Sequence, residues 1–138
     1  MVILRNIKHS QITNYQIIIR SLLRKTIYLQ EFGHFNKDFI KELCRFCEVF
    51  YPKLTVACLP VLNFDKELPT IKKRKNCYGD QFLAQDILAY MEKRVPKDAY
   101  CVMGITLNDI YPGDNWNYVY GWAKYKARVG IFSFLRWD

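Results

Sequence analysis

The chain has 138 residues, the length of one domain with a single hydrophobic core. Hydrophobic residues make up 51% and charged residues 25%, which excludes a disordered chain, and no apolar run approaches the roughly 18 residues of a membrane span. The net charge of +8 favours an anionic partner, but the basic residues gather in two local runs, one before Glu31 and one at residues 72–75. We interpret them as a basic N-terminal segment and a solvated loop, so a nucleic-acid groove is disfavoured.

The first 25 residues show weak periodicity and no clear helix cap, so we treat residues 1–25 as a basic extension of uncertain structure. Residues 26–29 then predict a short strand. After a turn at residues 33–36, a helix is predicted over residues 37–51, and Pro52 prevents its continuation. Apolar residues at helical spacing predict one buried stripe on this helix, formed by Phe39, Leu43, Phe46, Cys47 and Phe50.

A mostly apolar run predicts a buried strand over residues 54–59, and residues 63–79 are charged and predict a surface loop. Asp80 then predicts the cap of a second helix with one apolar face, formed by Leu83, Ala84, Ile87, Leu88 and Met91. Residues 99–107 are nearly continuously apolar, which is typical of a central parallel strand covered on both faces.

Strict alternation over residues 116–123 predicts a two-faced strand, and residues 129–135 predict a last strand beside it, after a polar turn. The predicted order is β-α-β-α-β-β-β, an α/β unit of about five strands and two helices. The alternating aromatic residues suit base stacking in a single-strand binder, but such a pattern is more typical of a half-buried strand; they are Trp116, Tyr118, Tyr120 and Trp122.

Groups for catalysis are scarce in this sequence. The two histidines, His9 and His34, have no partner at metal-ligand spacing, and neither H-E-x-x-H nor a glycine-rich phosphate loop occurs. Cys44 and Cys47 form a C-x-x-C in mid-helix, which we interpret as core cysteines rather than a redox pair or half a zinc knuckle. The five scattered cysteines and the lack of a secretory signal predict an intracellular protein, cytoplasmic or nuclear.

Three blocks, in order along the chain, resemble the archaemetzincins, also called archaelysins, a family of zinc metallopeptidases. They are DAYCVMGITLNDIYP at residues 98–112, NWNYVYG at residues 115–121 and VGIFSF at residues 129–134. Residues 27–30 and the helix ending at Tyr51 fit as well, so the resemblance covers residues 26–138.

The resemblance implies a metzincin-like N-terminal subdomain over residues 26–138, with a twisted mixed five-stranded sheet, an antiparallel edge strand and two backing helices. In such enzymes the edge strand is the upper rim of the substrate cleft, and an extended peptide adds to it through main-chain hydrogen bonds. The substrate-binding residues that the resemblance implies here are Asn117, Tyr118, Val119, Tyr120, Gly121 and Trp122.

Family members hold zinc with H-E-x-x-H-x-x-G-x-x-H, and this motif does not occur in the chain. No catalytic residue and no metal ligand can therefore be carried over, and we expect a truncated, non-catalytic chain, a pseudoenzyme that binds no zinc. Loss of a covering helix predicts self-association through an exposed patch at Phe132, Phe134 and Trp137. The alternative function is a small basic module that binds nucleic acid or another anionic partner.

Overall fold

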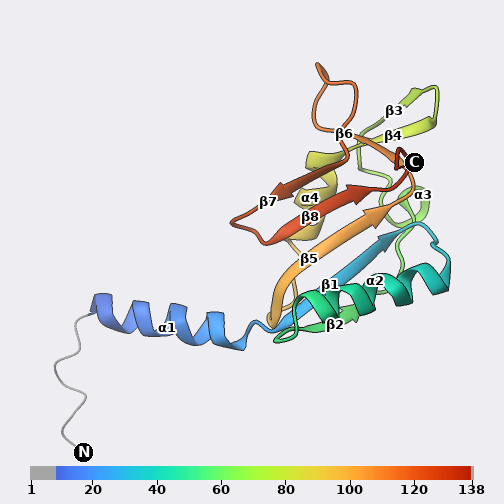
Figure 1. Cartoon of the computed structure of the whole chain (residues 1–138). Helices are drawn as coiled ribbons and strands as arrows, with labels where there is room; N and C mark the ends of the chain where they lie inside the picture. The colour runs from blue at the N-terminus through green and yellow to red at the C-terminus, as the bar shows by residue number, and fades with distance from the viewer. Residues whose placement is uncertain (1–8, 138) are drawn as a thin grey trace, which may run out of the picture.

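A computed structural model describes residues 9–137 of the chain, and its body is a mixed five-stranded sheet (Figure 1). The strand order is β2 (Thr55–Cys58), β1 (Thr26–Phe32), β5 (Ala99–Thr106), β8 (Val129–Ser133) and β7 (Gly121–Lys124). The first four strands run parallel, and β7 pairs antiparallel with β8 at the edge. The predicted α/β fold with an antiparallel edge strand is confirmed.

A second, three-stranded sheet replaces the predicted loop and helix cap. It consists of β3 (Lys73–Asn76), β4 (Gly79–Leu83) and β6 (Asp109–Tyr111), and a short helix, α3 (Phe64–Glu67), precedes it. The prediction of a loop over residues 63–79 was wrong, and so was the Asp80 cap, because Asp80 lies in β4. Phe82 and Gln81 of β4 are buried by pairing with β6, a long-range contact that local sequence cannot reveal.

The hydrophobic core lies between the five-stranded sheet and α4 (Ala84–Glu92), which packs behind the sheet in Figure 1. Four of the five residues predicted for its apolar face are buried, namely Ala84, Ile87, Leu88 and Met91, whereas Leu83 ends β4 and is half-buried. Gly104 of β5 allows close packing in the core. A Cβ atom there would lie 2.9 Å from both the Ile131 Cδ1 atom and the Phe32 Cε2 atom, so any larger residue would force these side chains to shift.

Residues 9–23 form a helix, α1 (His9–Leu23), which projects from the body (Figure 1). This corrects the interpretation of residues 1–25 as a segment of uncertain structure over the part that the structure describes; residues 1–8 lie outside the described residues. Within residues 9–137, no helix is long and apolar enough to cross a bilayer.

The helix α2 (Lys37–Phe50) forms as predicted, and the Asn36 side chain caps it by accepting a hydrogen bond of 2.8 Å from the Asp38 N–H. The predicted buried stripe is wrong, because no residue of α2 is buried. The half-buried residues are Ile40, Leu43, Cys44 and Cys47, whereas Phe39, Phe46 and Phe50 are exposed. The helix has a wide apolar face, and its contacts with the sheet are made mainly to the edge strand β2.

The side of the sheet opposite α4 is partly open. β5 is central and parallel to both neighbours, as predicted, but it is not covered on both faces, since Tyr100 and Met103 are exposed. In the predicted exposed patch, Trp137 is 69% exposed, while Phe132 and Phe134 are half-buried against each other with ring centroids 4.8 Å apart. Self-association through this side stays a prediction.

Candidate substrate-binding rim

The edge strand β7 has β8 as its sole ladder partner among the described residues. The Ser133 N–H donates a 2.8 Å hydrogen bond to the Tyr120 carbonyl just before β7 begins. Antiparallel ladders alternate, so Trp122 also directs its backbone groups toward β8, opposite Ile131. The N–H and C=O groups of Gly121 and Ala123 therefore point outward, to the unpaired edge.

The strand predicted over residues 116–123 is shorter than expected. β7 includes Gly121 and Trp122, while residues 117–120 lie in the loop that leads into it. The Val119 N–H donates to the Ile110 carbonyl of β6 at 3.0 Å, and this contact draws the loop toward the small sheet. The aromatic alternation thus does not come from a regular ladder, and Tyr118 packs instead under the Arg136 guanidinium, 3.8 Å from the ring centroid.

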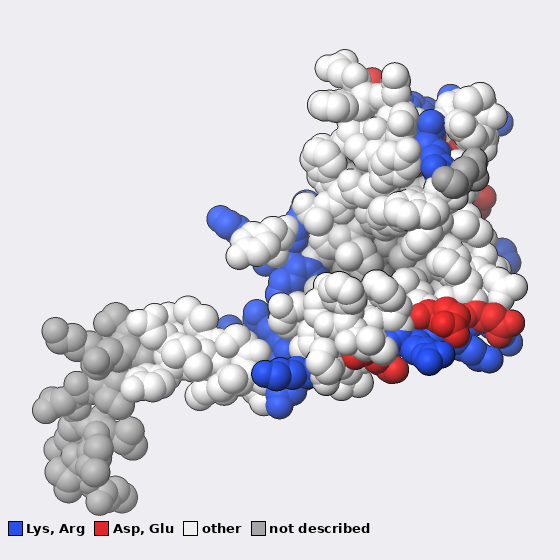
Figure 2. Space-filling view, in the orientation of Figure 1, with Lys and Arg blue, Asp and Glu red and all other residues white. Residues whose placement is uncertain are grey.

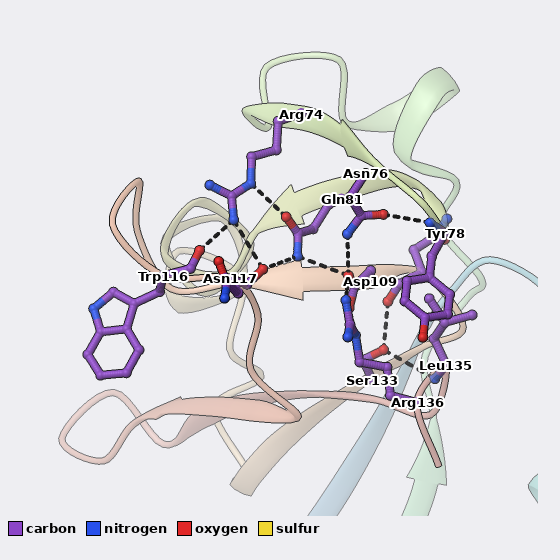
Figure 3. A network of polar contacts seen from close by, with 11 residues as sticks. Arg74, Asn76, Tyr78, Gln81, Asp109, Trp116, Asn117, Ser133, Leu135 and Arg136 are labelled. Atoms are coloured by element: carbon purple, nitrogen blue, oxygen red, sulfur yellow. Dashed lines mark hydrogen bonds and ion pairs between the residues drawn. The ribbon is translucent and has the colours of Figure 1, made fainter. Parts of the chain in front are cut away.

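Side chains of the small sheet hold the backbone of this loop (Figure 3). The Arg74 Nη2 group donates to the carbonyls of Trp116 and Asn117, and the Gln81 Nε2 group donates to the Asn117 carbonyl at 2.7 Å. Arg74 and Gln81 are themselves joined by a 2.6 Å hydrogen bond between Nε and Oε1. The Asn117 carbonyl is therefore already occupied and is not available to a peptide.

Asp109 is the charged centre of this network, and its side chain is fully buried. Its carboxylate accepts hydrogen bonds of 2.9 and 2.7 Å from Arg136, 2.7 Å from Asn76 and 2.9 Å from Gln81. Burial opposes ionisation, but the hydrogen bonds from Arg136 and Asn76 outweigh it, so the pKa of Asp109 is lower than usual. The ionised carboxylate of Asp109, on β6 of the small sheet, thereby links this sheet to the segment after β8.

Sequence reasoning missed this network. It placed Arg74 in a solvated basic run and gave no role to Asn76, Gln81, Asp109 or Arg136, although these residues line or hold a cleft of about 500 Å³ beside the loop. One signal was present, because Asp109 comes three residues after the end of the central strand β5, a region where polar side chains commonly gather.

The thiol of Cys44 contacts a cysteine on the neighbouring strand. The Cys44 Sγ atom lies 3.7 Å from the Cys58 Sγ atom on β2, so Cys44 contacts this residue rather than forming a pair with Cys47. Burial, followed by the hydrogen bond to Cys58, raises the pKa of Cys44 to about 12, and the thiol stays protonated. Residues 9–137 contain no group of three or more His, Cys, Asp or Glu side chains placed to hold a metal ion.

The mixed sheet with its antiparallel edge strand belongs to the class of fold found in solved archaemetzincins. The structure of the Archaeoglobus fulgidus archaemetzincin complexed with malonate matches with a TM-score of 0.57 at 22% identity, over 82% of this chain and 63% of that chain. The Methanopyrus kandleri archaemetzincin matches with a TM-score of 0.53 at 19% identity, over 83% and 60%. These likenesses establish the shared fold.

Sequence comparison agrees with the fold. Human archaemetzincin-2 is 35% identical over 120 residues, which are 83% of this chain and 33% of the relative, and rat archaemetzincin-1 is 32% identical over 127 residues, 89% and 25%. No protein-family model matches the chain. The chain belongs to the archaemetzincin family, as the resemblance predicted, and spans a third or less of the length of these relatives.

Proposed function

We propose that this chain is the substrate rim and sheet scaffold of an archaemetzincin-type zinc metallopeptidase, and that it binds an extended peptide without hydrolysing it alone. The observation that carries the proposal is the unpaired edge of β7, the last strand of the five-stranded sheet. The outward N–H and C=O groups of Gly121 and Ala123 can each bond to a peptide that adds as a further strand.

The anchored loop supports this role because it fixes the entry to the edge. Arg74 and Gln81 hold the loop backbone, and Asp109 holds Gln81, so residues 116–120 approach β7 along one path. Rigid positioning lowers the entropy lost when a peptide binds. Trp122 is 43% exposed and offers an aromatic surface to side chains of the bound strand.

Peptide hydrolysis by this family rests on zinc, which polarises the scissile carbonyl and lowers the pKa of a bound water. The described residues do not fit that metal, since they hold no cluster of three or more suitable ligands. We therefore assign no chemical step to this chain and propose that the metal ligands of an active enzyme come from outside residues 9–137.

The alternative of a basic nucleic-acid module draws no support from the second basic run. Lys72 pairs with Asp114 at 3.0 Å, and Lys73 pairs with Asp65 and Asp80 at 2.9 and 3.0 Å. Arg74 is engaged in the loop network. The run is therefore largely neutralised by contacts within the protein rather than presented to a polyanion.

Amide NMR of the full chain tests the rim, with the acetylated and amidated peptide Ala-Leu-Ala-Val-Ala as the probe. We expect the Gly121 and Ala123 amides to shift and gain protection from exchange, while the Trp122 amide, already directed to β8, stays unchanged. Equal shifts at all three amides, or none, would contradict a strand added at this edge.

A matched pair of proline variants sharpens this test. Ala123→Pro removes an outward N–H from β7 without removing a ladder bond, and we expect it to abolish peptide binding. Val56→Pro does the same at the opposite edge, on β2, where Thr55 and Leu59 donate to β1 and Val56 points outward. Binding that survives Ala123→Pro, or falls equally in both variants, would sink the proposal.

A further inference from the structure

One face of α1 is an apolar stripe that packs against nothing in the described protein. Its members recur at i, i+3, i+4, i+7 and i+8, the spacing of a single helix face, and we call them the α1 stripe: Tyr15, Ile18, Ile19, Leu22 and Leu23. Each of these side chains is between 52% and 65% exposed. Arg20 and Ser21 fall on the opposite face together with Ile17, so the charged and hydroxyl side chains of this part of the helix lie away from the stripe.

Basic side chains gather where α1 joins the body, and Figure 2 shows blue side chains there and no red on the visible face of α1. A groove of about 650 Å³ at this junction is lined by Arg24 and by residues of β5, β7, β8 and their connections. Its charged lining residues are all basic: Arg24, Lys124, Lys126 and Arg128. Lys124 is paired with Glu92 at 2.8 Å. Burial, followed by the positive charge of nearby Arg24, lowers the pKa of Arg128.

The charge of the junction limits what can cover the α1 stripe. A second copy that placed α1 in this groove would bring Arg20 and Arg24 against Lys126 and Arg128, like charges that cost free energy on approach. The sequence before Glu31 carries no acidic residue at all, so the helix itself offers no compensating charge. An apolar stripe beside an acid-free basic cluster is the pattern of helices that lie in the interface of an anionic bilayer.

We propose that α1 lies along an anionic phospholipid surface, with the α1 stripe in the boundary between headgroups and acyl chains and the positive charges of Arg24 and Lys126 near enough to the headgroups to attract them. At 15 residues, α1 is about 22 Å long and lies flat, with its polar face to water. Tyr125, which is 90% exposed at the tip of the β7–β8 turn, provides a second aromatic contact beside the groove. The α1 stripe is separate from the β7 edge, although Ala123 and Lys124 of β7 line the groove, so the inference rests on the helix and not on peptide binding.

Co-sedimentation of the full chain with lipid vesicles tests the inference. We expect binding to phosphatidylcholine vesicles that contain phosphatidylserine, weaker binding to phosphatidylcholine alone, and a loss of the difference at high salt. Arg24→Gln and Lys126→Gln should each weaken binding to the anionic vesicles about fivefold. Absence of binding, or binding that ignores the anionic lipid, would overturn the proposal.

The helix supplies its own matched control. Ile18→Ser with Leu22→Ser removes two members of the α1 stripe and should weaken vesicle binding by at least about tenfold. Ile17→Ser changes the same residue type on the other face, where Ile17 is 60% exposed, and should change binding less than about twofold. Thermal melts should be the same for all these variants, because none of the altered side chains is buried.

Two results would reassign the α1 stripe. If both serine variants weaken vesicle binding equally, the stripe is not the membrane-facing surface. If Ile18→Ser with Leu22→Ser instead dissolves a dimer, seen by sedimentation velocity, while vesicle binding is unchanged, a second copy covers the stripe and the membrane proposal falls.

Discussion

The helices α4 and α2 both have apolar residues at helical spacing, but only α4 buries them in this molecule. On α4 the apolar face packs against the sheet, and Ile87 and Leu88 have no exposed surface. On α2 no residue is buried, and Phe46 and Phe50 are 60% and 64% exposed. The spacing of apolar residues predicts that a helix has an apolar face. It does not predict whether another segment of the same chain buries that face.

The difference follows from where the two helices lie. α4 lies behind β7 and β8 (Figure 1), and its buried side chains share one core cluster with Val102 of β5 and Ile131 of β8. α2 contacts chiefly the edge strand β2, so only its half-buried side, with Leu43 and Cys44, faces the sheet. The aromatic side of α2, with Phe46 and Phe50, therefore stays exposed in the described structure.

The largest effect should come from the enclosed helix. Ile87→Ala on α4 removes a fully buried side chain and leaves a cavity, so we expect a loss of about 2–5 kcal/mol in the free energy of unfolding. Urea denaturation followed by circular dichroism measures it.

Breaking the rim network should cost somewhat less. Asp109→Asn keeps the shape of the side chain but removes the negative charge that accepts hydrogen bonds from Arg136 and Asn76. We therefore expect a loss of about 2–3 kcal/mol in the free energy of unfolding. Because Arg136 is partly exposed, water can replace some of the hydrogen bonds that its guanidinium group loses in this variant. Amide exchange should also rise in the loop before β7. A variant that melts like the wild type would show that the network does not stabilise the fold.

The same carboxylate gives a dependence on pH. Because the folded pKa of Asp109 is below its unfolded value, its contribution is complete above about pH 4 and is lost as the pH falls through the folded pKa. We therefore expect the wild type to lose stability faster than Asp109→Asn between about pH 4 and pH 2 in urea titrations. Parallel curves for the two proteins would contradict the lowered pKa.

The smallest effect should come from the exposed side of α2. Phe46→Ala removes a large apolar side chain at the surface, and we expect the free energy of unfolding to change by no more than about 0.5 kcal/mol. It is the counterpart of Ile87→Ala on the other helix, measured in the same way. A loss above about 2 kcal/mol would reveal that Phe46 packs against a second copy or a covered surface in solution.

The sequence by itself determined the regular elements with local signals. Helical spacing and Asn36 defined α2, apolar continuity defined β5, and the polar turn predicted at residues 124–128 separated β7 from β8. The blocks at residues 98–134 also carried the family, which the comparisons confirmed. These features depend on residues that are close in the sequence or on a sequence motif, so they can be predicted without the tertiary structure.

Only the tertiary structure decided which apolar faces are covered and where the polar side chains meet. Gln81 and Asp109 are 28 residues apart in the chain, and Arg74 reaches Asn117 across 43 residues, so no local pattern predicts either contact. The same contacts take up the loop backbone that was expected to form a strand at residues 116–120. Burial and hydrogen bonding depend on which segments the fold brings together, and that information is absent from the spacing of residues along the chain.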